Sequence, residues 1–299
     1  MDVYKEILAL KKKKNAIILA HNYQDKSIYK IADFIGDSLE LAKIAQETTK
    51  DIIIFCGVYF MAETAKILNP LKTVLIPNED AGCPMADLAE KEKILEMKRK
   101  YPNATTICYI NTTADVKTVC DICVTSSNAE KIINSLQTNQ IIFLPDKNLA
   151  SFVSKKSKKE IIPYDGYCYV HNLFTLADVE RVRGKYPDSF LIVHPEAPSE
   201  VVDLADHVCS TSKMIEVAKD AKQKYIIIGT ETGMIQMLKL KLPHKNFIPL
   251  NENRVCKNMK KINLKNVLNS LQNNEFEIEL PNETIRQAKI CINKMLELS

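Results

Sequence analysis

The sequence lacks a hydrophobic run long enough to span a membrane. The longest apolar stretch, Ile52–Ala62, falls well short of the roughly 20 residues that a transmembrane helix needs. The N-terminal segment also lacks the order of a signal peptide, because the basic run Lys11–Lys14 follows an amphipathic stretch instead of preceding a long apolar one. We therefore expect a cytoplasmic protein that does not bind membranes.

The sequence also lacks a strong excess of charge of either sign. It has 41 Lys and Arg against 37 Asp and Glu, which gives a net charge of +4 over 299 residues. A nucleic-acid-binding protein is usually more basic, with its basic residues clustered, so we do not expect nucleic acid as a partner. Small acidic substrates are compatible with this balance. The 46% of apolar residues is ordinary for a globular chain of two or three domains.

Nine cysteines are present although the chain shows no targeting segment. In a reducing compartment, cysteines serve as buried thiols, metal ligands or catalytic groups more often than as disulfides. We therefore expect that some of the nine cysteines bind a metal or take part in catalysis.

A unit that occurs three times organises the rest of the chain. Each copy has an apolar strand, an acidic residue followed by Ser or Thr at the start of a helix, a second strand, another helix, and a short strand that ends at or near proline. The first strands are expected at 16–23, 105–111 and 190–196, and the last at 73–77, 160–163 and 247–249. Strands that alternate with helices predict parallel sheets covered on both faces. The sequence predicts an α/β fold of three similar three-layer αβα domains.

The repeat also gives the expected domain boundaries. We expect the three α/β domains at residues 1–84, 85–170 and 171–262. Residues 263–299 show helical spacing in two segments, the second of which begins at Pro281. We expect these two helices to pack back on the first domain.

One cysteine follows the last proline of each unit. Cys83, Cys168 and Cys256 lie in short polar loops, where a small hydrophobic residue has little reason to be. Their recurrence once per unit predicts that they are metal ligands. Three thiolates can bind zinc together with a fourth ligand, or a [4Fe–4S] cluster in which one iron has no protein ligand. Wide spacing around a symmetric cleft favours the cluster.

The other cysteines are expected to be structural. Cys120 and Cys123 form a C-x-x-C motif, but apolar residues flank both sulfurs, so we predict a packing role for them. The remaining ones sit inside strand or helix patterns or next to a serine: Cys56, Cys108, Cys209 and Cys291.

Polar residues gather where the first strand of each unit ends. In open α/β sheets, ligands bind beyond the carboxyl ends of the strands. We therefore expect a central site that contains His21, Tyr23, Tyr109, Asn111, His194 and Glu196. His171 follows Cys168 by three residues and joins this site.

Hydroxyl residues stand at the predicted start of one helix in each unit, namely Ser38, Ser126 and Thr211. Each is a good N-cap residue, and a helix N-terminus also attracts anions. Three such ends around a cleft would bind a substrate with carboxylates or phosphate. Asp37, which precedes Ser38, belongs to the same predicted substrate-binding set.

Taken together, these motifs resemble a known family. The segments that carry the resemblance keep their order along nearly the whole chain: AHNYQ, ADFIGDSLELA, FMAETAKILNP, CPMAD, YINTTADVK, VTSSNA, HPEAP, STSKM, GTETGM and VCKNMKK. They are similar to the quinolinate synthase family of NAD biosynthesis. The resemblance implies three domains around a pseudo-threefold axis with the active site at the centre, and a [4Fe–4S] cluster on Cys83, Cys168 and Cys256.

The resemblance also implies a reaction and its residues. Iminoaspartate and dihydroxyacetone phosphate condense to quinolinate, phosphate and water, with L-aspartate oxidase or aspartate dehydrogenase as a functional partner. The family's substrate contacts match His21, Ser38, Tyr109, Asn111, Ser126, His194, Glu196 and Thr211, and Tyr23 matches a tyrosine that transfers protons. The residue types suit acid–base catalysis by His21, Tyr23, Tyr109, His194 and Glu196. Some members carry a C-terminal cysteine-rich motif, which Cys291 alone does not provide.

Two alternatives stay open at this point. One is a different cluster-dependent hydro-lyase or radical enzyme on the same scaffold. The other is a non-catalytic iron–sulfur or zinc sensor. A sensor does not need a ring of polar side chains at strand ends, so the predicted ring favours an enzyme.

Overall fold

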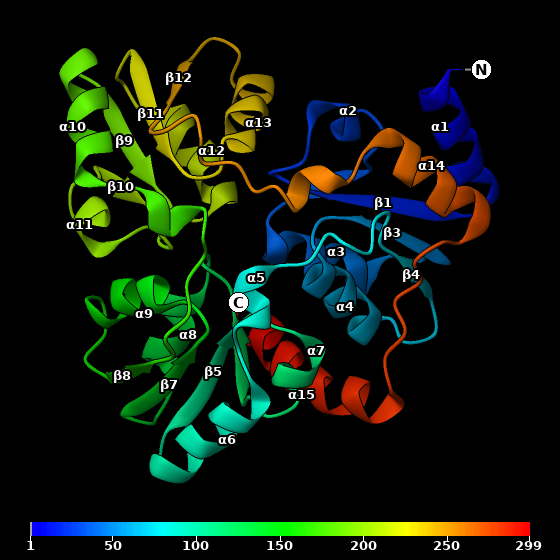
Figure 1. Cartoon of the computed structure of the whole chain (residues 1–299), viewed down its shortest axis with the longest axis horizontal. Coiled ribbons are helices and arrows are strands. Elements are labelled where there is room, and N and C mark those ends of the chain that lie inside the picture. The colour runs from blue at the N-terminus through cyan, green and yellow to red at the C-terminus, as the bar shows by residue number, and fades with distance from the viewer. Residues whose placement is uncertain (1) are drawn as a thin grey trace.

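The fold consists of three α/β units that follow one another along the chain and surround a common centre (Figure 1). A computed structural model describes residues 2–299. Within these residues the strands form three four-stranded sheets, and all strand pairs in them are parallel. The predicted fold class, three parallel α/β sheets, is confirmed.

Each unit repeats the same alternation of four helices and four strands. The first contains α1 (Val3–Lys13), β1 (Ala16–His21), α2 (Lys26–Tyr29), β2 (Phe34–Gly36), α3 (Ser38–Glu47), β3 (Ile52–Cys56), α4 (Tyr59–Leu68) and β4 (Thr73–Leu75), followed by α5 (Pro84–Asp87). The second contains α6 (Lys91–Lys100), β5 (Thr105–Tyr109), α7 (Ala114–Lys117), β6 (Ile122–Val124), α8 (Ala129–Ser135), β7 (Gln140–Leu144), α9 (Lys147–Ser154) and β8 (Glu160–Pro163), followed by the 3-10 turn η1 (His171–Leu173). The third contains α10 (Leu176–Lys185), β9 (Phe190–Val193), α11 (Ser199–Val202), β10 (His207–Val208), α12 (Thr211–Asp220), β11 (Tyr225–Gly229), α13 (Gly233–Lys241) and β12 (Asn246–Pro249), followed by η2 (Met259–Lys261).

The strand order is also the same in every unit. The sheets run β2-β1-β3-β4, β6-β5-β7-β8 and β10-β9-β11-β12, so the first strand of each unit is central and the second lies at an edge. The central strands are buried along their length, as the six residues of β1 show, because helices cover both faces. Sequence patterns predicted three strands per unit and missed the edge strands β2, β6 and β10. These have only two or three residues, too few to show a period.

An aspartate at the start of each edge strand fastens that strand to its central neighbour. Its carboxylate accepts a hydrogen bond from a backbone N–H of the central strand, and its own N–H donates to the carbonyl of the same residue. The carboxylate bonds join Asp33 to Ile18 at 2.8 Å, Asp121 to Thr106 at 2.7 Å and Asp206 to Leu191 at 2.7 Å. A cation from the helix that precedes the central strand pairs with each carboxylate. These cations are Lys11 at 2.7 Å, Lys98 at 3.3 Å and Arg183 at 2.9 Å. The aspartates that the repeat singled out therefore hold the sheets together.

The C-terminal segment forms the two helices that the sequence predicts. They are α14 (Leu264–Asn273) and α15 (Asn282–Leu298), with Pro281 at the N-cap of the second. Helix α14 packs on α1 in the first unit, whereas α15 packs on β6 and α7 in the second and also touches α4 (Figure 1). The exact domain boundaries stay a prediction. No helix in residues 2–299 is long and apolar enough to cross a membrane.

The aspartate contact leads to a prediction for Asp121. Asp121→Ala should lower the free energy of unfolding by about 1 to 3 kcal/mol, because the N–H of the fully buried Thr106 loses its acceptor. Asp121→Asn keeps an acceptor oxygen and loses only a half-exposed ion pair, so its cost should stay below about 1 kcal/mol. Urea denaturation of both variants checks this, and equal losses would show that the ion pair, not the backbone contact, matters.

Candidate active site

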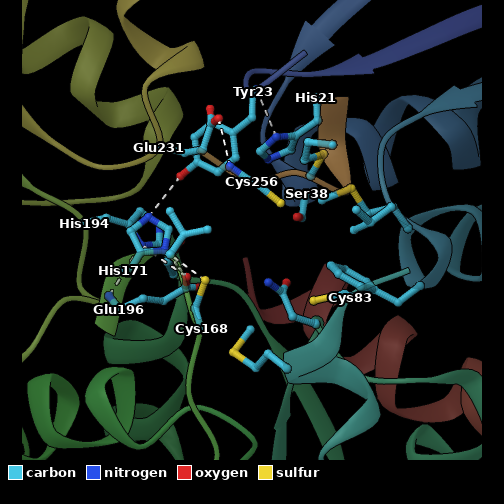
Figure 2. A pocket seen from close by; sticks show the side chains of 18 of the residues that line it. His21, Tyr23, Ser38, Cys83, Cys168, His171, His194, Glu196, Glu231 and Cys256 are labelled. Atoms are coloured by element: carbon cyan, nitrogen blue, oxygen red, sulfur yellow. Dashed lines mark hydrogen bonds and ion pairs between the residues drawn. The ribbon is translucent and has the colours of Figure 1, made fainter. Parts of the chain in front are cut away.

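A pocket lies at the centre of the molecule, where the carboxyl ends of strands from the three sheets face one another (Figure 2). Its empty volume, including space that is open to solvent, is about 750 Å³. The site residues predicted from the sequence all line it: His21, Tyr23, Asp37, Ser38, Cys83, Tyr109, Asn111, Ser126, Cys168, His171, His194, Glu196, Thr211 and Cys256. The structure therefore brings them into one space from all three units.

Three cysteines occupy equivalent turns around this pocket. Cys83 directly precedes α5, and Cys168 and Cys256 stand just before η1 and η2. In each turn the cysteine carbonyl accepts a backbone N–H from four residues later, at 3.1 Å for Cys83, 2.9 Å for Cys168 and 3.3 Å for Cys256. Figure 2 shows the three on different sides of the central space. They are the same position of the same motif, three times over.

The spacing and burial of these sulfurs suit a cluster better than a single ion. Within residues 2–299, the sulfurs of Cys83, Cys168 and Cys256 do not form a group in which every separation is 4.8 Å or less. One zinc ion would draw its sulfurs closer, because each Zn–S bond measures about 2.3 Å. Burial raises the pKa of the Cys83 thiol to about 12 and raises the pKa of the other two thiols as well. A positively charged group must therefore be bound for all three to ionise at neutral pH.

Two buried carboxylates fix the turns of the second and third cysteines. Asp146 follows β7 and accepts from the N–H of Cys168 at 3.0 Å and of Leu149 at 2.7 Å. Glu231 follows β11 and accepts from the N–H of Cys256 at 3.1 Å and of Gly233 at 2.7 Å. Both carboxylates come from residues with no exposed surface. They orient the backbone that carries the sulfurs.

Lys260 sits against the second of these carboxylates. Its ammonium lies 3.4 Å from Glu231 and donates to the carbonyl of Tyr23. Gly233 stands beside this contact, and a Cβ there would come within 2.8 Å of the Tyr23 carbonyl oxygen. A residue without a side chain is therefore required where the first and third units meet.

A hydrogen-bonded network crosses the pocket wall at His171. Its Nδ1 lies 2.7 Å from a Glu196 oxygen and 3.2 Å from the Cys168 sulfur, and its Nε2 lies 2.8 Å from the Thr230 hydroxyl. The Tyr23 hydroxyl is bonded to Thr230 at 2.6 Å. The stacked rings of His171 and His194, with centroids 4.7 Å apart, complete the wall. The network links one cysteine turn to a tyrosine of the first unit.

Burial sets the protonation of these groups. It lowers the pKa of His21 and of His194 to about 3, so both imidazoles are neutral at pH 7. It raises the pKa of Tyr23 and Tyr109, and the negative charge of Glu196 adds to that effect. Burial opposes ionisation of Glu196 too, but His171 and His194 outweigh it and lower the pKa of that carboxyl. Among these groups, Glu196 is therefore ionised at pH 7, whereas the two imidazoles and the two phenols are neutral.

The hydroxyl residues at the helix starts are not N-caps, which corrects the expectation from the sequence. Ser38 and Thr211 are the first residues of α3 and α12, and the N-cap positions belong to Asp37 and Ser210. Ser126 precedes α8 by three positions. Asp37 displaces Ser38 because its carboxylate accepts from two backbone N–H groups, those of Leu39 and Glu40. It also accepts from Ser127 of the second unit at 2.8 Å, so its carboxylate is already engaged.

Known proteins with similar sequences identify the family. The family model of the quinolinate synthetase A protein matches residues 5–297. The quinolinate synthase of Thermodesulfovibrio yellowstonii is 48% identical over 294 residues, which cover 98% of this chain and 97% of that protein. The quinolinate synthase of Pyrococcus abyssi is 48% identical over 301 residues and covers 100% of both chains. This chain belongs to the quinolinate synthetase A family.

Membership in the quinolinate synthetase A family confirms the resemblance seen in the sequence motifs, and it makes the chain an enzyme of NAD biosynthesis. The sequence analysis nevertheless missed four residues of this site: Asp146, Thr230, Glu231 and Lys260. The first three directly follow or closely follow β7 and β11. The rule that strand ends carry the site was applied only to the first strand of each unit. Applied to β7 and β11 as well, it would have found Asp146, Thr230 and Glu231.

The two carboxylates that hold the cysteine turns give the next prediction for this family member. In iron-free protein, Asp146→Asn should speed alkylation of Cys168, and Glu231→Gln that of Cys256, by about tenfold or more. A lost hydrogen bond to a charged group costs about 1.5 to 3 kcal/mol, and 1.4 kcal/mol is a factor of ten in an opening equilibrium. Peptide mass spectrometry after timed iodoacetamide labelling measures it.

The matched control is Asp165→Asn, which removes an exposed carboxylate that pairs with Lys147 near the same turn. It should leave both alkylation rates unchanged. If Asp146→Asn and Glu231→Gln also show the alkylation rates of the wild-type protein, the carboxylates do not hold the cysteine turns.

Proposed function

We propose that this enzyme condenses iminoaspartate with dihydroxyacetone phosphate and releases quinolinate, phosphate and water. The observation that carries the proposal is the central pocket, where three equivalent cysteine turns and the polar strand ends of three units share one space. Family membership supports the same reaction, since the relatives are named quinolinate synthases. The buried polar side chains beside the cysteines favour catalysis over a purely structural metal site.

Cys83, Cys168 and Cys256 would hold a [4Fe–4S] cluster. When bound, the cluster supplies an iron that has no protein ligand and that can act as a Lewis acid on a substrate oxygen. The equivalent turns of the three cysteines support this assignment, as does the fact that their sulfurs are not all within 4.8 Å of one another. Asp146 and Glu231 keep two of the three sulfurs in place through the backbone.

Both substrates are anionic, and the pocket offers donors for them. Ser38 and Thr211 open ten-residue helices, whose N-termini carry partial positive charge, and neither hydroxyl is used as a cap. The Ser126 hydroxyl lines the same pocket from the second unit. The Oδ1 atom of Asn111 is buried without a hydrogen-bond partner among the described residues, so a ligand donor would satisfy it. The hydroxyls of Ser38, Ser126 and Thr211 and the two helix N-termini would bind the carboxylates and the phosphate, and Asn111 Oδ1 would accept from a substrate N–H or O–H.

We assign proton transfer to groups in the pocket whose pKa values burial shifts away from their ordinary values. Tyr23 and Tyr109 hold their protons at neutral pH and can donate them, because burial raises the pKa of both. His21 and His194 are neutral and can donate one N–H while the other nitrogen accepts. Glu196 stays ionised and orients His171 at 2.7 Å. We assign Tyr23, placed between Thr230 and His171, to the proton transfers of the condensation.

Iminoaspartate must be supplied by an enzyme that oxidises aspartate, and an L-aspartate oxidase or an aspartate dehydrogenase has the required chemistry. We place the reaction in the cytoplasm, because all nine cysteines in the described chain are free and three of them must stay reduced to bind iron.

A zinc protein is the second candidate, and one observation favours it. The ligand atoms of Cys168, His171 and Glu196 all lie within 4.8 Å of one another inside the pocket. Sulfur, imidazole and carboxylate are all zinc ligands. A zinc ion there would leave Cys83 and Cys256 without a role, which favours the cluster.

Anaerobic product analysis tests the proposal. The protein should form quinolinate and phosphate from dihydroxyacetone phosphate and iminoaspartate generated from aspartate in the same vessel. Cys83→Ser, Cys168→Ser and Cys256→Ser should each lose bound iron and product formation, whereas Cys56→Ala, a buried cysteine of β3, should keep both. A colourless protein that contains zinc at Cys168 and no iron would overturn the proposal.

Anion recognition gives a separate prediction. Ser38→Ala and Thr211→Ala should weaken quinolinate binding roughly tenfold to a hundredfold, because each loses a hydrogen bond to a charged group worth about 1.5 to 3 kcal/mol. The stability of Ser38→Ala should change little, since the cap is Asp37, whereas Thr211→Ala also removes a buried acceptor of Asn22 at 3.1 Å and should cost about 1 kcal/mol. Calorimetric titration and thermal unfolding of the same samples separate the two effects.

Thr175→Ala is the matched control, because Thr175 is a true N-cap with a complete capping box in α10 and does not line the pocket. It should lose about 1 kcal/mol of stability and no affinity. If Ser38→Ala and Thr211→Ala behave like this control, the helix ends do not bind the substrate.

A further inference from the structure

A second group of cysteines lies in the core of the second unit, away from the catalytic pocket. The sulfurs of Cys108, Cys123 and Cys291 all lie within 4.8 Å of one another. Cys123 is 3.2 Å from Cys108 and 3.2 Å from Cys291. None of the three has any exposed surface, and none lines the central pocket.

Three different elements bring these sulfurs together. Cys108 on β5 and Cys123 on β6 are direct partners in the register of two parallel strands, so their side chains leave the sheet on the same face. Helix α15 packs on β6 and contributes Cys291, whose sulfur lies 3.2 Å from that of Cys123. The contact joins residues that are 168 positions apart in the sequence.

A fourth cysteine, Cys120, lies next to these three. Cys120 precedes Cys123 in the C-x-x-C motif, and its sulfur donates to the carbonyl of Val116 at 3.3 Å. Burial opposes ionisation of Cys108, but hydrogen bonds from Cys120, Cys123 and Cys291 outweigh it and lower the pKa of that thiol. Cys120 therefore lies beside the three, although its sulfur is not within 4.8 Å of all of them. Cys120 is also the member nearest to solvent, with 8% of its surface exposed.

The charge next to the group is positive. Lys117 is fully buried, and its ammonium donates to the carbonyls of Ile110 and Thr112 and lies 5.7 Å from the centre of the Phe60 ring. Within residues 2–299 no carboxylate lies within 4.0 Å of it. The buried Glu63 feels this charge, but burial raises the pKa of that carboxyl, so its compensation of Lys117 is incomplete. Thiolates bound to a metal ion carry a net negative charge that would compensate it.

We propose that Cys108, Cys120, Cys123 and Cys291 bind one divalent thiophilic ion of the zinc class, as a structural site separate from the catalytic pocket. In a tetrahedral zinc–thiolate site the sulfurs lie roughly 3.8 Å apart, because each Zn–S bond measures about 2.3 Å. Among Cys108, Cys123 and Cys291, two of the sulfur separations are 3.2 Å and the third does not exceed 4.8 Å. The C-x-x-C spacing is common in such sites. The ligand thiols release their protons to solvent as the ion binds.

Bound in this way, the ion would fasten α15 to the second sheet. Cys291 is the contribution of α15, and the other three ligands belong to β5, β6 and the turn before β6. The packing role that the sequence analysis gave to these cysteines would then be only part of their function. The site does not depend on the proposed reaction, and its failure would leave that proposal untouched.

Metal analysis of the intact, anaerobically purified enzyme tests the proposal. Protein from zinc-supplemented cells should contain about one zinc per chain, and X-ray absorption at the zinc edge should show three or four sulfur neighbours at about 2.3 Å. Cys123→Ala and Cys291→Ala should lose at least nine-tenths of the zinc and should keep their iron. Cys168→Ser, in the central pocket, should lose iron and keep zinc.

Three results would overturn the proposal: wild-type enzyme without zinc, zinc bound mainly by nitrogen or oxygen, or zinc that persists in Cys123→Ala. Retained iron shows that a variant is folded. If Cys123→Ala does not fold, the zinc content of Cys120→Ala, at the edge of the group, and the X-ray absorption spectrum of the wild-type enzyme test the proposal instead. Cys56→Ala, another buried cysteine with no sulfur contact to the group, should leave the zinc content unchanged.

Discussion

In a parallel sheet every strand ends at the same edge, and in this chain that edge faces the centre of the molecule three times. His21, Tyr109 and His194 reach the pocket because they end, or directly follow, the central strand of their sheets. The cysteine turns reach it because they follow the last strand of each unit. A site assembled in this way needs all three sheets at once. A shift of one sheet would move its cysteine and its polar side chains together.

The electrostatics of the pocket follow from how its buried charges are compensated. Burial raises the pKa of Asp146 and of Glu231, which backbone N–H groups and, for Glu231, Lys260 offset only in part, whereas two imidazoles outweigh burial at Glu196. Backbone donors cannot move away as a flexible lysine can, so the carboxylates and the turns they hold form rigid bodies. Lys260 is the cation that touches this arrangement, and it sits at the back of the site against Glu231. Helix N-termini and hydroxyls line the pocket, and Lys260 does not.

Much of this architecture could be predicted from the sequence, because repetition makes weak signals add up. The central strands and the three cysteines Cys83, Cys168 and Cys256 were placed by comparing one unit with the next, and the C-terminal helices by their helical spacing. The edge strands were missed, since two or three residues cannot show a period. The capping roles were also wrong, because Asp37 and Ser38 are both good caps and only the backbone geometry chooses between them.

The contacts between distant segments lay beyond sequence reasoning for a different reason. Cys123 and Cys291 are far apart along the chain, and neither occurs in a repeated position. Nothing in the local pattern of TVCDICV shows that a helix near residue 291 covers it. Asp146 and Glu231 are a milder case, because their place after β7 and β11 was visible but their partners, the N–H groups of Cys168 and Cys256, were not.

Helix α15 completes the second unit although it is made last. Its buried face, formed by Ile285, Ala288, Cys291, Ile292 and Met295, covers β6 and α7. On the ribosome, the second unit therefore emerges with one side of its core uncovered, and it stays so while the whole third unit is synthesised. The first unit is in a similar position until α14 arrives on α1. The third unit can therefore bury its core as soon as it is synthesised. The cores of the first two units are fully covered only after the C-terminal helices have been made.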